Sequence, residues 1–254
     1  MFRAVDYDDG LHRGYELGRG LSWDAVMAWR AALTRWLPHQ RPLAVLELGS
    51  GTGRFSRFIA DVGGGRVYAV EPSHRMRAIA VAEHRHDRVH CLAGRAEAIP
   101  LAAASCDAAV LFFVLHHVAD LEAAAGELAR VLRDGGRVLV AGSFSERLHP
   151  RTYYRYLPRA REIESELFPK LEDVARTFGK TGLTITGFDE VEHEVADSLA
   201  SYRSRLGYRA ISTFEHMTED EINEGLSRLS TDADAEHGLQ PVRHVHDLVT
   251  FSLS

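Results

Sequence analysis

The chain has 254 residues, enough for one α/β domain of ordinary size with an added lid. A hydrophobic fraction of 45% supports a core, yet no apolar run reaches the ~18 residues that a membrane-spanning helix needs. The formal net charge of −6 argues against a nucleic acid or an anionic membrane as partner. The N-terminus lacks the apolar stretch of a secretory signal, and two cysteines are too few for a disulfide framework. We therefore expect a globular protein of the cytoplasm.

The beginning of the chain differs in character from the remainder. Residues 1–40 are rich in aromatic side chains and have helical rather than strand-like patterning. We expect them to form a helical N-terminal cap on a main domain that spans residues 41–254.

From residue 43 to residue 144, short apolar runs alternate with stretches of helical spacing. The expected strands are 43–49, 66–72, 88–94, 106–115 and 137–144. Strands separated by helices at this spacing are joined by right-handed βαβ crossovers and form a parallel sheet.

The C-terminal part adds two more strands. Strand-like composition at 183–196 and at 246–254 is interrupted by helical stretches at about 145–182 and 197–240, which we interpret as lid insertions. The whole pattern predicts an α/β fold with a doubly wound, mostly parallel seven-stranded sheet of the Rossmann-like kind, with the helical cap and the insertions added to it.

The sharpest feature is the segment LELGSGTGRFS, in which a strand leads through a glycine-rich turn into a helix. Gly49, Gly51 and Gly53 permit positive φ angles and close approach of a ligand to the backbone. The free N–H groups of this turn, which includes Ser50, and the helix N-terminus behind it favour polar or anionic ligand atoms. We interpret the turn as a cofactor-binding loop because it follows a strand and opens a helix.

A dinucleotide is the obvious alternative ligand, since its fingerprint is G-x-G-x-x-G/A in the same setting. Counted from the first or the second glycine, the third position is Arg54 or Ser56, and neither is the small residue that close helix–strand packing needs. Glu47 within the motif would also repel a diphosphate. A ligand with a cationic amino-acid end suits this carboxylate better, which favours S-adenosylmethionine.

A second acid, Glu71, ends the next expected strand. A carboxylate there can accept hydrogen bonds from both ribose hydroxyls of an adenosine cofactor. It can also act as a negative charge at the start of the following helix, beside Ser73 as the expected N-cap.

No metal site is expected. The 14 histidines contain no set of three or four ligands with a recognisable spacing. His244 and His246 alternate as they would on one face of a strand.

Four segments in order resemble a known family. They are VLELGSGTGRFS, YAVEPSHRM, AGRAEAIPLAAASCDAAV and ELARVLRDGGRVLV. Residues 43–144 resemble the class I S-adenosylmethionine-dependent methyltransferases, in particular the subgroup with small-molecule substrates and a ubiquinone-biosynthesis-like domain. The first 40 residues and the last 110 or so match only loosely.

The resemblance implies a role for each matching residue. Glu47 would lie near the methionine amino group, the backbone from Gly49 to Gly53 would face the methionine end and the ribose, and Glu71 would hold the ribose. The other residues that the resemblance assigns to the cofactor are Pro72 and Met76 beside the adenine, Ala96 and Glu97 near its amino group, Phe112 and Phe113 along the methionyl side, and Tyr15 and Arg19 at the methionine carboxylate. Arg95 replaces an acid that relatives often carry. Since side chains alternate along a strand, we expect one of the two phenylalanines to belong to the core.

His116 and His117 follow the fourth strand, at the carboxyl edge where open α/β folds bind ligands. Either could act as a catalytic base, because histidine titrates near neutral pH; a loop histidine bonded to backbone is the alternative. The insertions are expected to shape an acceptor pocket with aromatic and basic residues. The candidates are Tyr153, Tyr154, Tyr156, Tyr202 and Arg203.

The sequence thus predicts an enzyme that transfers a methyl group from S-adenosylmethionine to an O, N or C nucleophile of a small molecule and releases S-adenosylhomocysteine. A nucleotide-dependent oxidoreductase and a non-catalytic cofactor-binding module are the alternatives. A nucleic-acid methyltransferase is disfavoured by the lack of a basic face. The acceptor and the oligomeric state stay open.

Overall fold

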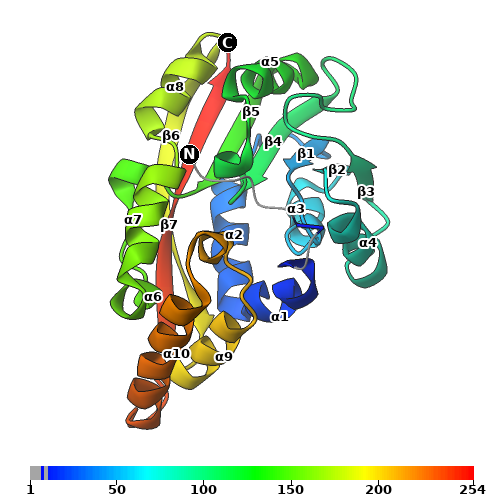
Figure 1. Ribbon diagram of the computed structural model, residues 1–254. Helices are drawn as coiled ribbons and strands as arrows, with labels where there is room; N and C mark the ends of the chain where they lie inside the picture. Colours follow the sequence, from blue (N-terminus) through cyan, green and yellow to red (C-terminus); the bar gives the residue numbers. More distant parts are fainter. Residues whose placement is uncertain (1–6, 9–10) are drawn as a thin grey trace.

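The computed structural model describes residues 7–8 and 11–254. Its centre is a seven-stranded sheet in the order β3-β2-β1-β4-β5-β7-β6 (Figure 1). The strands are β1 (Val45–Leu48), β2 (Val67–Glu71), β3 (Val89–Ala93), β4 (Cys106–Phe112), β5 (Leu132–Gly142), β6 (Leu183–Ala196) and β7 (Val242–Leu253). Strands β1 to β5 are parallel, and β7 is antiparallel to both of its neighbours. The predicted doubly wound, mostly parallel sheet is confirmed.

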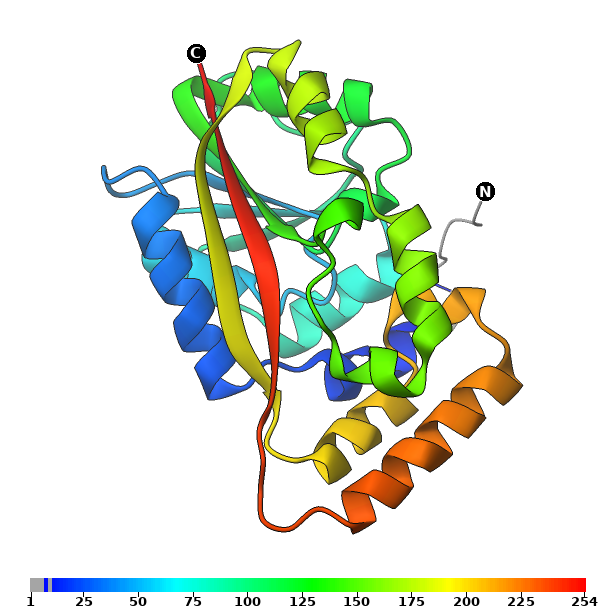
Figure 2. The ribbon, with the colours of Figure 1, turned by 90° about the vertical axis from the view of Figure 1, so that its left-hand side faces the viewer.

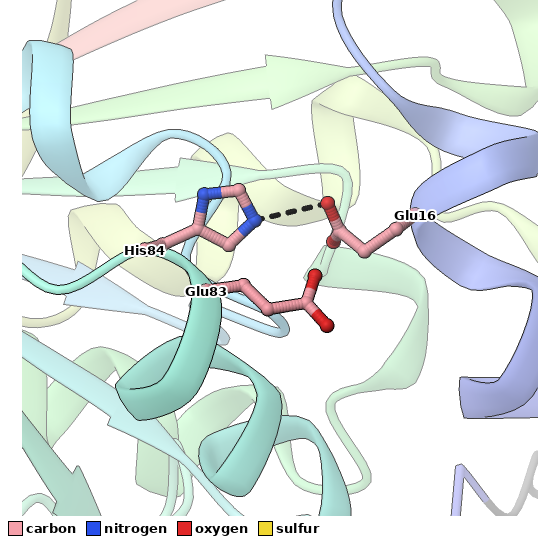
Figure 3. Close-up of side chains that lie close together, drawn as sticks. All are labelled: Glu16, Glu83 and His84. Atoms are coloured by element: carbon pink, nitrogen blue, oxygen red, sulfur yellow. Dashed lines mark hydrogen bonds and ion pairs between the residues drawn. The ribbon is translucent and has the colours of Figure 1, made fainter.

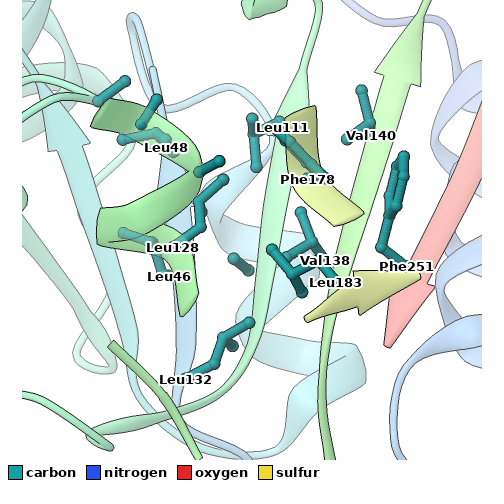
Figure 4. Packing of buried hydrophobic residues seen from close by; sticks show 14 of the residues in the cluster. Leu46, Leu48, Leu111, Leu128, Leu132, Val138, Val140, Phe178, Leu183 and Phe251 are labelled. Atoms are coloured by element: carbon teal, nitrogen blue, oxygen red, sulfur yellow. The ribbon is translucent and has the colours of Figure 1, made fainter. Parts of the chain in front are cut away.

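Helices cover both faces of this sheet, because neighbouring residues of its central strands point to opposite sides. On one face, α2 (Trp23–Trp36) and α3 (Ser56–Gly63) pack on a cluster that includes Val110 and Leu139. On the other face, α5 (Leu121–Val131) and α8 (Leu171–Gly179) pack on Leu111, Val138 and their neighbours (Figure 4). Alternate residues of β4 and β5 thus enter two separate cores.

The helix α4 (His74–Glu83) follows β2 and contacts β2 and β3. Its start is fixed by Ser73, whose hydroxyl oxygen accepts the backbone N–H of Met76 at 3.1 Å. The expected N-cap is therefore confirmed, and it sets the direction in which the chain leaves Glu71.

The two C-terminal insertions meet in one helical lid with its own apolar cluster. The lid consists of α6 (Thr152–Tyr156), α7 (Pro158–Leu167), α9 (Leu199–Gly207), α10 (Glu219–Asp234) and the 3₁₀ segment η4 (Ser212–His216). Figures 1 and 2 show α6, α9 and α10 at one end of the molecule, beside the ends of β6 and β7. The helix α8, which we expected within the first insertion, packs instead on α5 and β6 in the sheet layer.

The N-terminal cap closes the remaining side of the lid. The cap includes the 3₁₀ segment η1 (Leu11–Gly14) and the helix α1 (Tyr15–Arg19). The helix α1 contacts the lid helix α9. A Cβ atom on Gly18 would lie only 2.6 Å from the Cβ of Ala210, so α1 approaches the lid as closely as a glycine allows. Residues 1–6 and 9–10 of the expected cap lie outside the described residues. Among the helices that the structure describes, none has the length and apolar character to cross a membrane.

Candidate functional site

The loop between β1 and α3 contains three glycines whose backbone conformation leaves space for a ligand. Gly49, Gly51 and Gly53 have φ angles of 69°, 56° and 82°, which residues with a Cβ rarely adopt. A Cβ on Gly49 would lie 2.2 Å from the side chain of Val114, whereas a Cβ on Gly51 would meet nothing within 4 Å. The backbone N–H groups of Gly49 and Ser50 donate to the Val70 carbonyl at 2.8 and 3.1 Å. The loop is therefore fixed against β2 and leaves free space above Gly51.

Glu47 lies buried beneath this loop, with 1% of its surface exposed. Its Oε2 accepts a hydrogen bond from the Ser56 hydroxyl, while its Oε1 has no hydrogen-bond partner among the described residues. Burial raises the pKa of Glu47 to about 8. The site thus contains a carboxyl group that is mostly protonated at neutral pH and that a cation would ionise.

Glu71 connects the loop to the start of α4. Its Oε2 accepts the Gly51 N–H at 2.9 Å and its Oε1 accepts the Ser73 N–H at 2.8 Å. Burial raises its pKa as well. A carboxylate has about four acceptor positions, so these two bonds leave capacity for ligand hydroxyls.

The residues that we expected beside the adenine differ in their environments. Met76 is buried and Pro72 is exposed. Ala96 is also buried. Glu97 instead accepts the backbone N–H groups of Ala119 and Asp120 at 3.0 and 3.2 Å, so its carboxylate fixes the entry to α5.

An ion pair holds α1 beside the glycine loop (Figure 3). The Nε2 atom of His84, at the end of α4, lies 2.9 Å from Oε2 of Glu16. The hydrogen bond to Glu16 raises the pKa of His84, since it favours the imidazolium form. Glu83 completes a group of ligand-type atoms within 4.8 Å, as Glu190 does with His149 and Asp247 elsewhere. In each group a hydrogen bond of at most 2.9 Å already joins the imidazole to one of the two carboxylates.

The two phenylalanines at the end of β4 have different environments. Phe112 is buried in the core, stacked on Phe55 with ring centroids 4.1 Å apart. Phe113 leaves the strand with a φ angle of 56° and lines a cavity, where its ring lies 4.6 Å from that of His246. Phe112, which we expected along the cofactor, is thus a core residue packed with α2 and α3 that does not line this cavity, and Phe113 is the half-buried member of the pair that does.

This cavity lies between the carboxyl edge of the sheet, the cap and the lid, and has a volume of about 130 Å³. The predicted residues Tyr15, Arg19, His116 and His117 all line it. The Nε2 of His117 lies 2.8 Å from the Tyr7 hydroxyl, so the N-terminal segment is bonded to the end of β4. Burial lowers the pKa of His117 to about 4 and that of His116 well below its usual value, so both rings are neutral at pH 7.

The far wall of the cavity is polar. His193, His244 and His246 line it together with Arg151 and Glu164. Tyr153 and Tyr202 belong to this wall as expected. Two other candidates do not, because the Tyr156 hydroxyl donates to Asp232 and the Arg203 guanidinium donates to Ser230. Tyr154 reaches Glu164 from behind the wall through its hydroxyl.

Arg54 is a site residue that the sequence did not identify as a ligand contact. Its guanidinium lies over the Phe55 ring at 4.4 Å, donates to the Arg19 carbonyl and lines the cavity. Burial lowers its pKa to about 10. The signal for it in the sequence is a basic residue directly after the third glycine.

Comparisons with known proteins show to which family the chain is related. A family model described as a methyltransferase domain matches residues 46–140. A ubiquinone/menaquinone biosynthesis C-methyltransferase (UbiE) of Syntrophotalea carbinolica is 32% identical over 194 residues, which cover 70% of this chain and 81% of that protein. A demethylmenaquinone methyltransferase of Thermus thermophilus is 35% identical over 127 residues, 49% of this chain, and only 58% of its own length is spanned.

The fold has solved counterparts. The crystal structure of a putative methyltransferase from an antibiotic biosynthesis pathway of Anabaena variabilis matches with a TM-score of 0.71 at 24% identity. The match covers 89% of this chain and 97% of that one. At this identity the likeness concerns the fold.

The two phenylalanines give a matched test of the site boundary. Phe112→Ala removes a stacked core ring and should lower the free energy of unfolding by roughly 3–5 kcal/mol. Phe113→Ala should lower it by less than half of that amount, because one side of its ring faces the cavity. Urea unfolding of the two variants measures both values; equal losses would place Phe113 in the core as well.

The buried histidines predict a loss of stability in mild acid. His193, His244 and His246 are each at most 6% exposed, and burial lowers the pKa of His193 to about 4 and the others well below 6.5. The unfolded chain binds protons below pH 6.5 that the folded chain cannot bind, so stability is present above pH 6.5 and lost as the pH falls toward 4, by about 1.4 kcal/mol per pH unit for each histidine.

The measurement is urea unfolding at pH 7, 6 and 5 for the wild type, His193→Gln and the exposed control His39→Gln. His193→Gln should show a slope shallower by about one proton, whereas His39→Gln should keep the wild-type slope. A wild-type slope in His193→Gln would mean that this ring is protonated in the folded protein.

Proposed function

The chain belongs to the class I S-adenosylmethionine-dependent methyltransferases with small-molecule substrates, and from this premise we propose that the glycine loop after β1 binds S-adenosylmethionine and that the adjoining cavity binds the acceptor. The observation that carries the proposal is the free space above Gly51, whose N–H donates to the buried carboxylate of Glu71. Nothing favours an oxidoreductase or a non-catalytic binding module.

The residues around the loop fit the parts of this cofactor. The unpartnered Oε1 of Glu47 suits an ammonium group, and the remaining acceptor capacity of Glu71 suits the ribose hydroxyls. Arg19 and Arg54 suit the methionine carboxylate by charge-assisted bonds. The remaining proposed contacts are Tyr15, the backbone from Gly49 to Gly53 with Ser50, the apolar side chains of Met76, Ala96 and Phe113, Pro72 at the exposed rim, and the backbone beside Glu97.

When bound, the cofactor supplies an activated methyl group, so the protein has mainly to position the acceptor and to exclude water. The cap and the lid enclose the cavity and serve this exclusion. His116 and His117 are neutral at pH 7 and line the cavity, so either ring can accept a proton from the acceptor. The Tyr7 hydroxyl already forms a hydrogen bond with Nε2 of His117. We therefore propose His116 as the base that accepts the proton.

A pair of glycine variants tests the cofactor site. Gly51 and Gly135 have φ angles of 56° and 70°, and a Cβ on either would meet nothing within 4 Å. An alanine at either position should therefore cost a similar backbone strain, about 1–2 kcal/mol. Only at Gly51 does the added methyl group fill the proposed cofactor space.

Calorimetric titration with S-adenosylhomocysteine reads the difference. Gly51→Ala should bind at least tenfold more weakly than the wild type, while Gly135→Ala should bind with the wild-type affinity. Equal affinities of the two variants, or binding of NADH in place of S-adenosylhomocysteine by the wild type, would contradict the assignment of the loop.

Because the pKa of Glu47 is raised, we predict that cofactor binding releases a proton. Its pKa of about 8 leaves it protonated at pH 7, and an ammonium group placed beside it favours the ionised form. Titration of S-adenosylhomocysteine at pH 7 in buffers of different ionisation enthalpy should show release of up to one proton. The release should vanish in Glu47→Gln, and a heat that is independent of the buffer in the wild type would place the amino group elsewhere.

A further inference from the structure

Arg151 is a cationic group of the cavity that cofactor binding does not use. It precedes α6, and its Nη2 donates to the Ser143 hydroxyl at 2.7 Å, directly beyond the end of β5. Arg19 and Arg54, which we assign to the cofactor, lie beside the loop after β1. The strand order places β4 between β1 and β5, and adjacent strands are about 4.8 Å apart. Arg151 therefore lies roughly 10 Å further along the sheet edge, on the acceptor side.

The histidines around Arg151 satisfy only part of its guanidinium. Its Nη1 lies 3.2 Å from Nε2 of His246, and its Nη2 lies 3.1 Å from Nδ1 of the same ring. A neutral imidazole has one acceptor nitrogen, so at most one of these contacts is a hydrogen bond. The ring is neutral because burial lowers the pKa of His246 well below its usual value.

His244, unlike His246, offers Arg151 no acceptor. Its Nε2 lies 3.4 Å from the backbone N–H of Thr152, which can only donate. The proton of the neutral ring is then on Nδ1, and this is the atom that lies 3.4 Å from Nη1 of Arg151. A guanidinium has five N–H donors, whereas the hydroxyls of Ser143 and Tyr154 and one nitrogen of His246 provide three acceptors.

The carboxylate in the same wall is already engaged. Glu164 accepts the Tyr153 hydroxyl at 2.5 Å, the Tyr154 hydroxyl at 2.5 Å and the Thr213 hydroxyl at 2.9 Å. Among residues 7–8 and 11–254, no carboxylate forms an ion pair with Arg151. The other guanidinium of the lid wall, that of Arg205, donates to the backbone carbonyls of Gly20 and Val195. Among the described residues, Arg151 thus keeps N–H donors that no acceptor matches.

We propose that the methyl acceptor is a compact organic anion whose carboxylate binds the guanidinium of Arg151, an inference that rests on the proposed function. The planar fork of arginine matches a carboxylate in a two-point contact. Aromatic side chains, among them Phe113, Phe168 and Tyr202, form the rest of the wall. The whole cavity, including the part beside Arg19 and Arg54 that we assign to the cofactor, has a volume of about 130 Å³, so the acceptor has to be small.

The test compares benzoate with its neutral analogue benzamide. Calorimetric titrations are run on the wild type saturated with S-adenosylhomocysteine, at physiological salt. Benzoate should bind at least tenfold more tightly than benzamide. In R151Q the preference for benzoate should disappear while S-adenosylhomocysteine binds as in the wild type, which also shows that the variant is folded. R151K, which keeps the charge without the fork, should recover part of the preference.

Arg161→Gln is the matched control, because it removes one positive charge from an exposed position on the lid helix α7. It should leave both affinities unchanged. Equal binding of benzoate and benzamide by the wild type, or no binding of benzoate, overturns the anion site. Failure of the wild type to bind S-adenosylhomocysteine counts against the proposed function instead. The titrations of the wild type with benzoate and benzamide need no variant. They therefore test the anion site even if R151Q does not fold.

Discussion

The rest of the site depends on the backbone of the loop after β1, which must turn through three residues with positive φ angles. Val114, at the end of β4, occupies the place where a side chain of Gly49 would lie, and the carbonyl of Val70 on β2 holds two N–H groups of the loop. The loop is therefore fixed by both strands that flank β1. Its free side opens above Gly51, and the N–H of that residue in turn fixes Glu71. One backbone turn thus sets the positions of the open space and of a carboxylate beside it.

Local pattern was sufficient for those parts of the protein whose determinants are adjacent in sequence. The glycine spacing with Glu47, the cap at Ser73 and the alternation of strands and helices each lie within a short segment, and the sheet follows from them through the handedness of βαβ crossovers. The alternation of side chains also predicted that one of Phe112 and Phe113 belongs to the core. It could not say which, because Phe113 leaves the strand in a left-handed conformation that depends on the loop beyond it.

The acceptor wall could not be predicted in the same way. Arg151, Glu164, His193 and His246 come from four separate elements, and only the pairing of β6 with β7 and the packing of the lid bring them together. Tyr156 and Arg203 have the same composition signal as Tyr153 and Tyr202 but point toward α10. The rotation of a lid helix about its own axis decides which side chains face the cavity, and tertiary packing sets that rotation.

Global charge was also a poor guide to the site. The chain has a formal net charge of −6, yet among the described residues four arginines and two glutamates line the cavity. A net charge governs long-range attraction to extended partners such as nucleic acid, whereas a small ligand responds to the groups within a few ångströms of it. Two of these arginines, Arg54 and Arg205, bind backbone carbonyls, which orient a guanidinium without neutralising it. Arg151 likewise keeps N–H donors that no described acceptor matches, so an acidic chain can bind an anionic acceptor at this wall.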